Sequence, residues 1–498
     1  MIALLFVAVA VCLAILWLWY RHYYEPYFVL KRSIGLPGPT PEMFFGNSRS
    51  IVDKGWIECT KQWSERYGPT YLYFIGIQPV IFTQDVDIIH SVFVNKAGHF
   101  LERSNLPNMI SDEKANDIGG ATCYEWKRMH RMLSPLFTSK KVMQMGPLVD
   151  VCCARMMKRL DELLHDNDTI DVYKLFGNYT MEAILTIAFG RDVDSQSNEG
   201  KRLSECLSML GGKTSKWGMI GVSTIVSHAS WTMLVFRALL KKSPLGQSWS
   251  YVRKVAAMMV DERCTNKTKR ADILQGMIDL MDDGASKDDL AFNKLEVNAN
   301  AKLFLFAGSE TTRNAISLTC YCLASNHKVQ EKAFGEIEKY FSESSGASLY
   351  EAVENIPYLE MVVLEGLRHY IPVKHLYRHC IDSCALNDNL LVPKGTLIYV
   401  PILHINFIPD YWSNPDAFDP ERFDPNIVVN NTEGFLSFGA GPRICLGKRL
   451  GLLNIKMGLV SILRKYRLDL ANDTNVEIDY SGMATYPKYG VQLKLIPR

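Results

Sequence analysis

The first twenty residues of the chain include no charged side chain. They read MIALLFVAVAVCLAILWLWY, and a helix of that length would span about 30 Å, the thickness of the hydrocarbon core of a bilayer. No basic residue precedes the run and bulky aromatic residues end it, unlike a cleaved signal peptide. Because Arg21, Lys31 and Arg32 follow the run, the positive-inside rule predicts a transmembrane signal anchor over 1–20, with the remainder of the chain in the cytosol.

A stretch rich in proline and glycine follows this run. Residues 35–41 read GLPGPTP, which cannot continue a helix and favours a short, stiff, extended spacer. Together with the basic residues before it, this stretch forms a predicted linker over 21–41. The soluble body then begins near residue 42.

Beyond the linker, the spacing of apolar residues is mostly helical. Most segments of 125–341 repeat apolar residues with the 3.6-residue period of a helix, whereas residues 71–82 form an apolar run split by Gly76 and Pro79, which predicts a pair of strands. The sequence contains no internal repeat, low-complexity tract or second linker. It therefore predicts a mainly α fold with small β-sheets, in a single domain over 42–498.

One internal stretch, 217–236, also lacks charged residues and is long enough for a second span. Its serines, threonines, histidine and glycines make it only weakly apolar. We therefore expect a helix pair that dips into the membrane interface, or plain core, rather than a second crossing.

Composition and charge narrow the classes of protein. With 48% hydrophobic and 22% charged residues among 498, the chain can bury a large core and is not a disordered chain. Its 55 Lys plus Arg against 53 Asp plus Glu give a net charge of +2, so the overall charge does not indicate a nucleic-acid partner. The 12 cysteines are scattered, which is typical of reduced thiols rather than of a disulfide scaffold.

The strongest chemical signal is the segment 438–447, which reads FGAGPRICLG. Its glycines and proline forbid regular structure around Cys445, and the apolar run after it resumes a helix. A thiol at a helix N-terminus, with Arg443 nearby, is favoured in its anionic form. These glycines would also let a flat macrocycle approach the backbone. Cys445 is therefore predicted to be an anionic ligand.

This segment resembles the haem-binding pattern of the cytochrome P450 family, F-x-x-G-x-R-x-C-x-G. Every fixed position is matched, namely by Phe438, Gly441, Arg443, Cys445 and Gly447. The resemblance implies a haem b cofactor with Cys445 as the axial ligand of its iron. It also implies the cytochrome P450 fold, here preceded by one N-terminal transmembrane helix.

Two further motifs match the family. Glu365 and Arg368 place opposite charges at i and i+3 of a helix, by themselves a common surface pair; with Arg422, in the sequence PERF, they resemble the family's structural charge triad. Upstream, residues 307–311 read AGSET within an apolar helix expected over 295–323.

In the family this helix crosses over the haem. The resemblance implies that Ala307 makes room for dioxygen, while Thr311 and Glu310 hold water and relay protons. In a plain core helix the threonine would only be a satisfied hydroxyl.

The haem propionates need cations or N–H donors. The resemblance nominates Trp126, Arg378 and Arg443, with Arg103 as a looser candidate. His130 stands where the family usually has arginine, which implies a contact that is weaker, pH-dependent or taken over by Arg131. A simple surface histidine is the alternative.

One tract rich in histidine and cysteine could instead supply the ligands of a zinc ion. Its candidate ligands are His369, His375, His379, Cys380 and Cys384. Their spacing fits no standard zinc site. The family places this tract as a strand beside the haem and substrate, so we favour that interpretation.

Basic residues gather in two places, and most such runs are only solvated surface. They are Lys127, Arg128, Arg131, Lys140 and Lys141, and Lys448 and Arg449. By resemblance both groups lie on the thiolate side of the haem. There an acidic NADPH-cytochrome reductase could dock, with cytochrome b5 as a second candidate donor.

The resemblance extends over the chain after the anchor, and some segments look similar to the animal clan of drug and steroid oxidases that also contains thromboxane synthase. It implies a monooxygenase of the endoplasmic reticulum membrane that inserts one oxygen atom from O2 into a lipophilic substrate (a steroid, fatty acid or xenobiotic), using NADPH-derived electrons. An isomerase of lipid peroxides is the alternative, and a non-catalytic haem-binding sensor is a further one. Retention of Glu310 and Thr311 favours the monooxygenase.

By resemblance, the substrate pocket includes Phe306, Ala307, Val373 and Met483, each of which could equally be ordinary core. An apolar lining suits a lipid or steroid. Lys302, before Phe306, could meet an acidic group of the substrate or face solvent.

Overall fold

The structure is a computed structural model, and part of the chain is described. The described residues are 2–21, 25–42, 44–103, 117–165, 167–195, 197–212, 239–266, 269–281, 291–388, 390–426, 434–471, 476–482 and 484–498. The segment 217–236 and Met483, which the sequence singles out, lie outside them.

The chain divides into two compact units, each assembled from three segments that are far apart in the sequence. The smaller unit takes Met1–Met109, Thr214–Leu240 and His375–His404. The larger unit takes Ile110–Lys213, Lys241–Lys374 and Ile405–Arg498.

The smaller unit contains short helices and two sheets. Its described helices are α1 (Ile2–Trp19), α2 (Glu25–Ile34), α3 (Ser48–Lys54), α4 (Trp56–Tyr67), α5 (Val86–His90), the π-helix η2 (Ser91–Asn95) and the 3-10 helix η3 (Ala97–His99). Its described strands are β1 (Thr70–Ile75), β2 (Gln78–Thr83), β4 (Leu376–His379), β5 (Cys384–Asn387), β6 (Leu390–Val392) and β7 (Leu397–Val400). The short helix α18 (Ile402–Ile405) lies where the chain passes into the larger unit.

The main sheet of the smaller unit has the order β1-β2-β7-β4, with β2 and β7 parallel and the other pairs antiparallel. The strand pair predicted at residues 71–82 is therefore confirmed. The chain turns at Gly76, whose φ of 56° suits glycine. Pro79 lies inside β2 rather than ending it, just before Val80, the first residue that pairs with β7. A proline is tolerated there because it lacks a ladder partner on that side.

The larger unit is mainly helical. Its described helices are α6 (Cys123–Leu133), α7 (Ser139–Leu164), α8 (Val172–Phe189), α9 (Asn198–Gly211), α12 (Pro244–Asn266), α13 (Ile273–Ile278), α14 (Lys294–Ser325), α15 (His327–Glu343), α16 (Leu349–Asn355), α17 (Pro357–His369) and α19 (Lys448–Leu463), with the 3-10 helices η5 (Ser134–Phe137), η6 (Pro420–Phe423) and η7 (Gly441–Arg443). Its described strands are β3 (Thr169–Asp171), β8 (Tyr466–Leu470), β9 (Ile478–Asp479), β10 (Tyr486–Pro487) and β11 (Gln492–Pro497), in sheets of order β3-β11-β8 and β10-β9.

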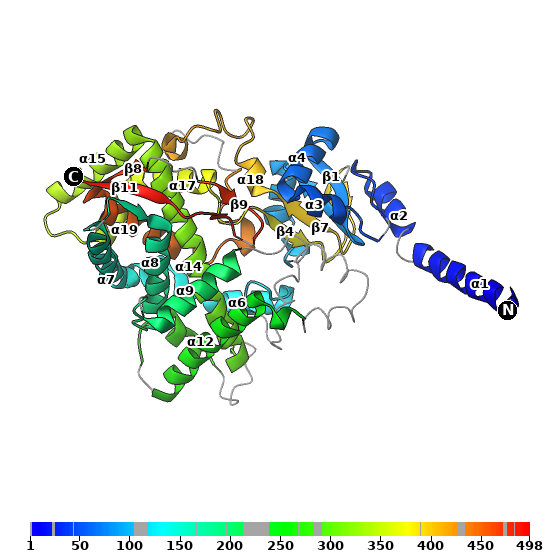
Figure 1. Cartoon of the computed structure of the whole chain (residues 1–498), viewed down its shortest axis with the longest axis horizontal. Helices are drawn as coiled ribbons and strands as arrows, with labels where there is room; N and C mark the ends of the chain where they lie inside the picture. The colour runs from blue at the N-terminus through cyan, green and yellow to red at the C-terminus, as the bar shows by residue number, and fades with distance from the viewer. Residues whose placement is uncertain are drawn as a thin grey trace. The chain divides into compact units, whose positions relative to one another are not determined.

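The longest helix, α14, runs through the middle of the larger unit (Figure 1). Asn293 and Glu296 form a capping box that starts it. It packs against α8, α9, α12, α17 and α19, so most of its side chains are buried. The helix expected over 295–323 is confirmed, with slightly wider bounds.

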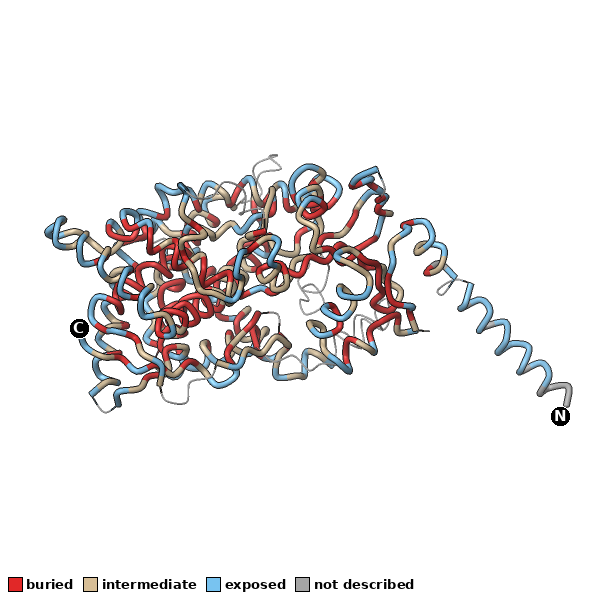
Figure 2. Tube along the Cα trace, turned by 90° about the horizontal axis from the view of Figure 1, so that it is seen from above, coloured by how far each residue is buried: buried red, intermediate tan, exposed pale blue. Residues whose placement is uncertain are grey.

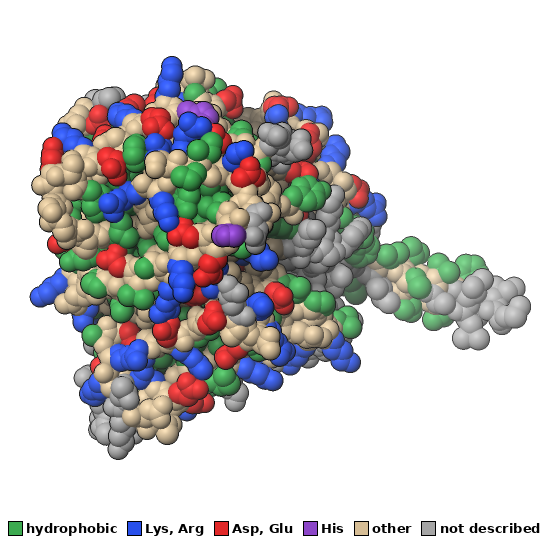
Figure 3. Space-filling view, turned by 60° about the vertical axis from the view of Figure 1, so that its left-hand side comes forward, with side chains coloured by type: hydrophobic (Ala, Val, Ile, Leu, Met, Phe, Trp, Pro, Cys, Tyr) green, Lys and Arg blue, Asp and Glu red, His purple; other side chains and the backbone are tan. Residues whose placement is uncertain are grey.

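The described side chains of α1 are exposed, among them Phe6, Leu13 and Trp17 (Figure 2). Among the residues that the structure describes, no helix is both long enough and apolar enough to cross a membrane. On the face drawn in Figure 3, basic and acidic side chains are interspersed.

Candidate functional site

The loop around Cys445 depends on two glycines in a left-handed conformation. Gly439 has a φ of 74° and Gly441 a φ of 67°, values that a side chain disfavours. The backbone N–H of Cys445 donates to the carbonyl oxygen of Phe438 at 2.8 Å, which closes the loop. Cys445 is exposed and lies three residues before the first residue of α19, Lys448.

One side of the first turn of α19 is uncovered, although Leu450 in the same turn is buried. A β-carbon added at Gly447 or Gly451 would meet no atom within 4 Å, whereas one added at Gly458 would come within 2.5 Å of Ile316 on α14. Later turns of α19 are thus packed, while the turn beside Cys445 borders open space. An exposed thiol next to such a space suits a flat group bound through sulfur.

One side of α14 is only partly buried. Its partly exposed residues include Phe304, Ala307, Gly308 and Thr311, whose spacing of three or four places them on one face of a helix. The hydroxyl of Thr311 donates to the carbonyl oxygen of Ala307 at 2.7 Å. The small residues and the hydroxyl that the sequence singled out therefore share this face.

Glu310 lies on a different side of the same helix. It is 5% exposed, and its carboxylate forms an ion pair with the guanidinium of Arg313. Burial raises the pKa of Glu310, and the positive charge of Arg313 opposes that rise. Arg313 was not singled out from the sequence, although its spacing of three from an acidic residue was a visible signal.

Arg443, Trp126 and His130 come together. Arg443 is 4% exposed and donates to the carbonyl oxygens of Ile118, at 3.1 Å, and Ala121, at 2.7 Å. Its guanidinium carbon lies 4.6 Å from the ring centroid of Trp126. The ring of Trp126 is 4.9 Å from that of His130.

His130 is half-buried rather than a surface residue. Burial lowers the pKa of its imidazole, and the charge of Arg443 lowers it further. Both effects favour the neutral form of the imidazole. One ring nitrogen lies 3.2 Å from the hydroxyl of Ser134.

Two of the nominated arginines belong to the smaller unit. Arg378, on β4, is buried, donates to the carbonyl oxygen of Tyr377 at 2.8 Å and lies 4.4 Å from the ring centroid of Phe93. Arg103 lies in the first segment of that unit. Their contact with a haem stays a prediction.

The expected pocket residues of the larger unit have different surroundings. Val373 is 36% exposed, and Phe306 is partly buried with its ring 6.3 Å from that of Trp249. Lys302 does not face solvent: it is 1% exposed, its ammonium lies 3.9 Å from a carboxylate oxygen of Asp117, and it covers the Trp249 ring at 4.8 Å.

The three charges of the predicted triad are joined. Arg368, with no exposed surface, donates to both carboxylate oxygens of Glu365 at 2.8 and 2.9 Å, and Arg422 reaches the same carboxylate at 3.3 Å. Arg368 also donates to the carbonyl oxygens of Asn406, at 2.6 Å, and Pro415, at 2.8 Å. Burial by itself would raise the pKa of Glu365, but the hydrogen bonds from Arg368 and His369 outweigh it and lower that pKa.

The tract considered for zinc is divided between the units, because His369 is in the larger one and the other four candidates are in the smaller. His369 lies 3.1 Å from the carbonyl oxygen of Ala417. Within the described ranges, no three side chains of His, Cys, Asp and Glu are close enough to hold one metal ion.

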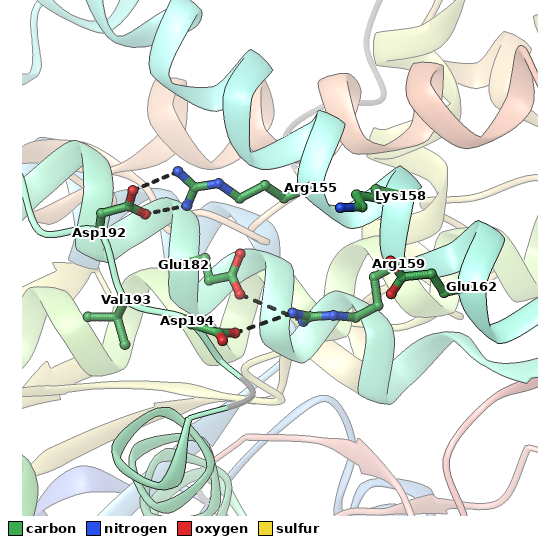
Figure 4. Close-up of a pocket in the computed structure, with 8 residues that line it drawn as sticks. All are labelled: Arg155, Lys158, Arg159, Glu162, Glu182, Asp192, Val193 and Asp194. Atoms are coloured by element: carbon green, nitrogen blue, oxygen red, sulfur yellow. Dashed lines mark hydrogen bonds and ion pairs between the residues drawn. The ribbon is translucent and has the colours of Figure 1, made fainter.

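A cleft of about 580 Å³ lies elsewhere, between α7, α8 and the segment after α8 (Figure 4). Arg155 donates to both carboxylate oxygens of Asp192, and Arg159 lies 3.7 Å from Glu182 and 3.6 Å from Asp194. Both arginines of this cleft are thus paired with carboxylates. It includes none of the residues that the sequence singled out.

The chain is similar in sequence to known proteins over most of its length. The family model of cytochrome P450 matches residues 36–495 of the chain. Cytochrome P450 3A29 of Sus scrofa is 31% identical over 473 residues, which cover 94% of this chain and 92% of that protein. Cytochrome P450 3A5 of Homo sapiens is 30% identical over 478 residues, with coverage of 94% and 92%. Thromboxane-A synthase of Rattus norvegicus is 28% identical over 530 residues, with coverage of 99% and 97%.

Proposed function

Because the chain belongs to the cytochrome P450 family, whose cofactor is a haem with a cysteine-ligated iron, we propose that it is a membrane-bound monooxygenase of lipophilic substrates. It inserts one oxygen atom from O2 and takes its electrons from NADPH. The observation that carries this proposal is the exposed thiol of Cys445 beside the uncovered side of the first turn of α19.

The residues of the larger unit fit a haem. Cys445 would supply the sulfur that binds the iron, Phe438 and Ala307 would border the group, and Arg443, Trp126 and His130 would hold its propionates. Arg378, which belongs to the smaller unit, is assigned as a further cation from the sequence alone. When bound, the haem supplies an iron at which dioxygen is activated, and a thiolate ligand favours cleavage of the O–O bond. The buried guanidinium of Arg443 would pair strongly with a propionate, since ionised partners make the strongest hydrogen bonds.

Thr311 is the residue that moves a proton. Its hydroxyl donates to the carbonyl oxygen of Ala307, and on the partly exposed face its oxygen would accept a hydrogen bond from a water. A hydroxyl and water placed in this way can deliver protons during turnover. Ala307, one turn earlier, leaves the space that dioxygen needs. Glu310, the preceding residue, is a second protonatable group, on the buried side of the same helix.

The substrate is a lipophilic steroid, fatty acid or xenobiotic. Phe306 and Val373 supply apolar surface, and Met483 is assigned to the same pocket from the sequence alone. An apolar lining with few polar groups suits such molecules.

The membrane and domain assignments rest on the sequence. Residues 1–20 are uncharged and apolar, 21–41 are basic and rich in proline and glycine, and 42–498 carry the haem-thiolate domain. This arrangement supports the proposal of a single-pass anchor in the endoplasmic reticulum membrane with the catalytic domain in the cytosol.

NADPH-cytochrome reductase is the proposed electron donor, with cytochrome b5 as a second donor. Exposed cations are available to an acidic partner: Lys127, Arg131, Lys140, Lys141 and Arg449 are exposed and Lys448 is partly exposed. Arg128 is not part of this docking surface, because it forms an ion pair with Glu296 and donates to the carbonyl oxygen of Ala291 at 2.5 Å.

An isomerase of lipid peroxides is the second candidate, since it would need neither reductase nor proton relay. One observation favours it: both relay groups are engaged, Thr311 with Ala307 and Glu310 with Arg313. The similarity to a thromboxane-A synthase over nearly the whole chain also supports it.

The carbon monoxide difference spectrum of the membrane-bound protein tests both candidates. We expect a red-shifted Soret band when electrons come only from NADPH through a microsomal reductase. We expect Cys445→Ala to abolish this band and Cys264→Ala, a change at an exposed cysteine on α12, to keep it.

Two results would contradict the proposal. A normal band in Cys445→Ala would show that another group ligates the iron. A band that forms with a chemical reductant but never with NADPH and reductase would favour the isomerase, and lipid peroxides would then be the substrates to assay.

A further inference from the structure

A buried polar cluster surrounds the guanidinium of Arg313 on α14. One of its terminal nitrogens donates to the phenol oxygen of Tyr173, at 2.9 Å, and contacts the carboxylate of Glu310; the other donates to the hydroxyl of Ser208 at 2.8 Å. The phenol of Tyr173 in turn donates to the side-chain oxygen of Asn314 at 2.8 Å. Arg313 is 7% exposed and Glu310 is 5% exposed. The cluster thus links α14 to α8 and α9.

Two glycines on neighbouring helices leave the space that Glu310 and Arg313 occupy. A β-carbon at Gly177, on α8, would lie 2.9 Å from the δ-carbon of Arg313. A β-carbon at Gly211, on α9, would lie 3.2 Å from a carboxylate oxygen of Glu310. Both neighbouring helices therefore lack a side chain at the point where the pair needs room. The carboxylate of Glu310 is directed toward α9, on the buried side of α14.

We propose that Arg313 is a positioning residue for proton delivery, because it pairs with the Glu310 carboxylate and holds it against α9. This inference rests on the proposed monooxygenase function. Glu310 can then release a proton only after the pair with Arg313 has opened and the carboxylate has been protonated. The gain or loss is a single proton at the carboxylate oxygen, and no bond between heavy atoms changes.

Few other titratable groups face the pair. From α8 comes Tyr173, whose pKa is raised to about 12 by burial, so it stays neutral near pH 7. From α9 comes Ser208, and from α14 itself comes Asn314, neither of which titrates. The charge of Arg313 is therefore the influence that limits the protonation of Glu310.

The test is the titration of Glu310, followed by the infrared band of a protonated carboxyl group in the haem-loaded full-length protein. Loss of the band in Glu310→Gln assigns it. We expect Arg313→Met to move the midpoint up by about one pH unit or more, because an opposite charge at contact lowers a carboxyl pKa by about that much. Arg155→Met is the matched control. It removes an arginine of α7 that pairs with Asp192, and it should leave the titration midpoint of Glu310 unchanged.

Arg313→Lys guards against misfolding, because it keeps the charge but cannot bond to Glu310, Tyr173 and Ser208 together. It should move the midpoint upward by less than Arg313→Met does. Equal midpoints in the unsubstituted protein and in both variants would overturn the inference. So would an NADPH-coupled product yield whose pH profile stays the same while the midpoint moves. Failure of the proposed function would look different, since the unsubstituted protein would give no NADPH-dependent oxidation and the infrared titration would still be measurable.

Discussion

At the scale of single residues, Thr311 has a matched counterpart on its own helix. Thr311 donates to the carbonyl oxygen of Ala307 at 2.7 Å, and Thr319 donates to that of Ala315 at the same distance. Thr311 is on the partly exposed face, whereas Thr319 has no exposed surface. The two hydroxyls thus differ in their access to water rather than in their own hydrogen bond.

We therefore expect Thr311→Ala to lower the fraction of NADPH consumption that ends in product by about tenfold or more, since a placed proton donor contributes about 10²-fold or more. The fraction is measured as product formed per NADPH oxidised. Thr319→Ala should leave it unchanged while lowering stability. Full coupling in Thr311→Ala would remove this threonine from the proton relay.

A second residue, Lys374, links two loops. Its ammonium, 7% exposed, donates to the carbonyl oxygen of Gly482 at 2.5 Å. Thr485 strengthens the link by donating its hydroxyl to the carbonyl oxygen of Ile371 at 2.5 Å. Burial lowers the pKa of Lys374 to about 8, and Asp479 opposes that shift.

This shift predicts a pH dependence of stability. Between pH 8 and about 10.4, the usual lysine pKa, the unfolded chain holds a proton that the folded protein has lost. The contribution of Lys374 to the free energy of unfolding therefore rises with pH across this window, by about 3 kcal/mol in total. Chemical denaturation of the protein and of Lys374→Met at several pH values measures it. The difference between them should grow with pH, whereas Lys328→Met, at an exposed lysine of α15, should show none.

At the scale of elements, the charge triad fixes α17 to the chain before and within η6. Arg368 satisfies the Glu365 carboxylate and backbone carbonyls of residues 406, 415 and 417, and the N–H of Asp419 donates to the same carboxylate at 2.9 Å. Without Arg368, the buried carboxylate of Glu365 would keep fewer hydrogen-bond partners. Removing one member of a buried pair typically costs about 3–5 kcal/mol.

Arg368→Met should therefore lower the free energy of unfolding by about 3–5 kcal/mol, measured by denaturant titration of the haem-loaded protein. Arg467→Met removes a partly exposed arginine whose partner is Asp469 and should cost about 1 kcal/mol or less. Similar losses in both variants would mean that the triad contributes no more than a surface pair.

Some features of these elements could be predicted from the sequence, and others could not. The helix α14 was predictable because its apolar spacing and the Asn293 and Glu296 capping box are local. The loop at Cys445 was predictable because left-handed positions select glycine. The ion pair of Arg128 with Glu296 was not predictable, since the two residues are 168 positions apart in the sequence. The surroundings of Glu310 were not either, because they depend on Gly177 and Gly211 coming alongside α14.

At the scale of the whole molecule, the mainly α composition with small sheets was predictable, and its division into units was not. Local patterns identify helices, but the smaller unit is completed by His375–His404, a segment far along the chain. Nothing in the neighbourhood of β2 indicates which later strand it pairs with.

The pairing of Val80 with Leu397 has a consequence for synthesis on the ribosome. The 316 residues between them take roughly 16–63 s to translate at about 5–20 residues per second. Throughout that interval β2 has an unpaired edge, which is the kind of surface that promotes aggregation. The nascent chain should therefore depend on chaperones until β7 has emerged.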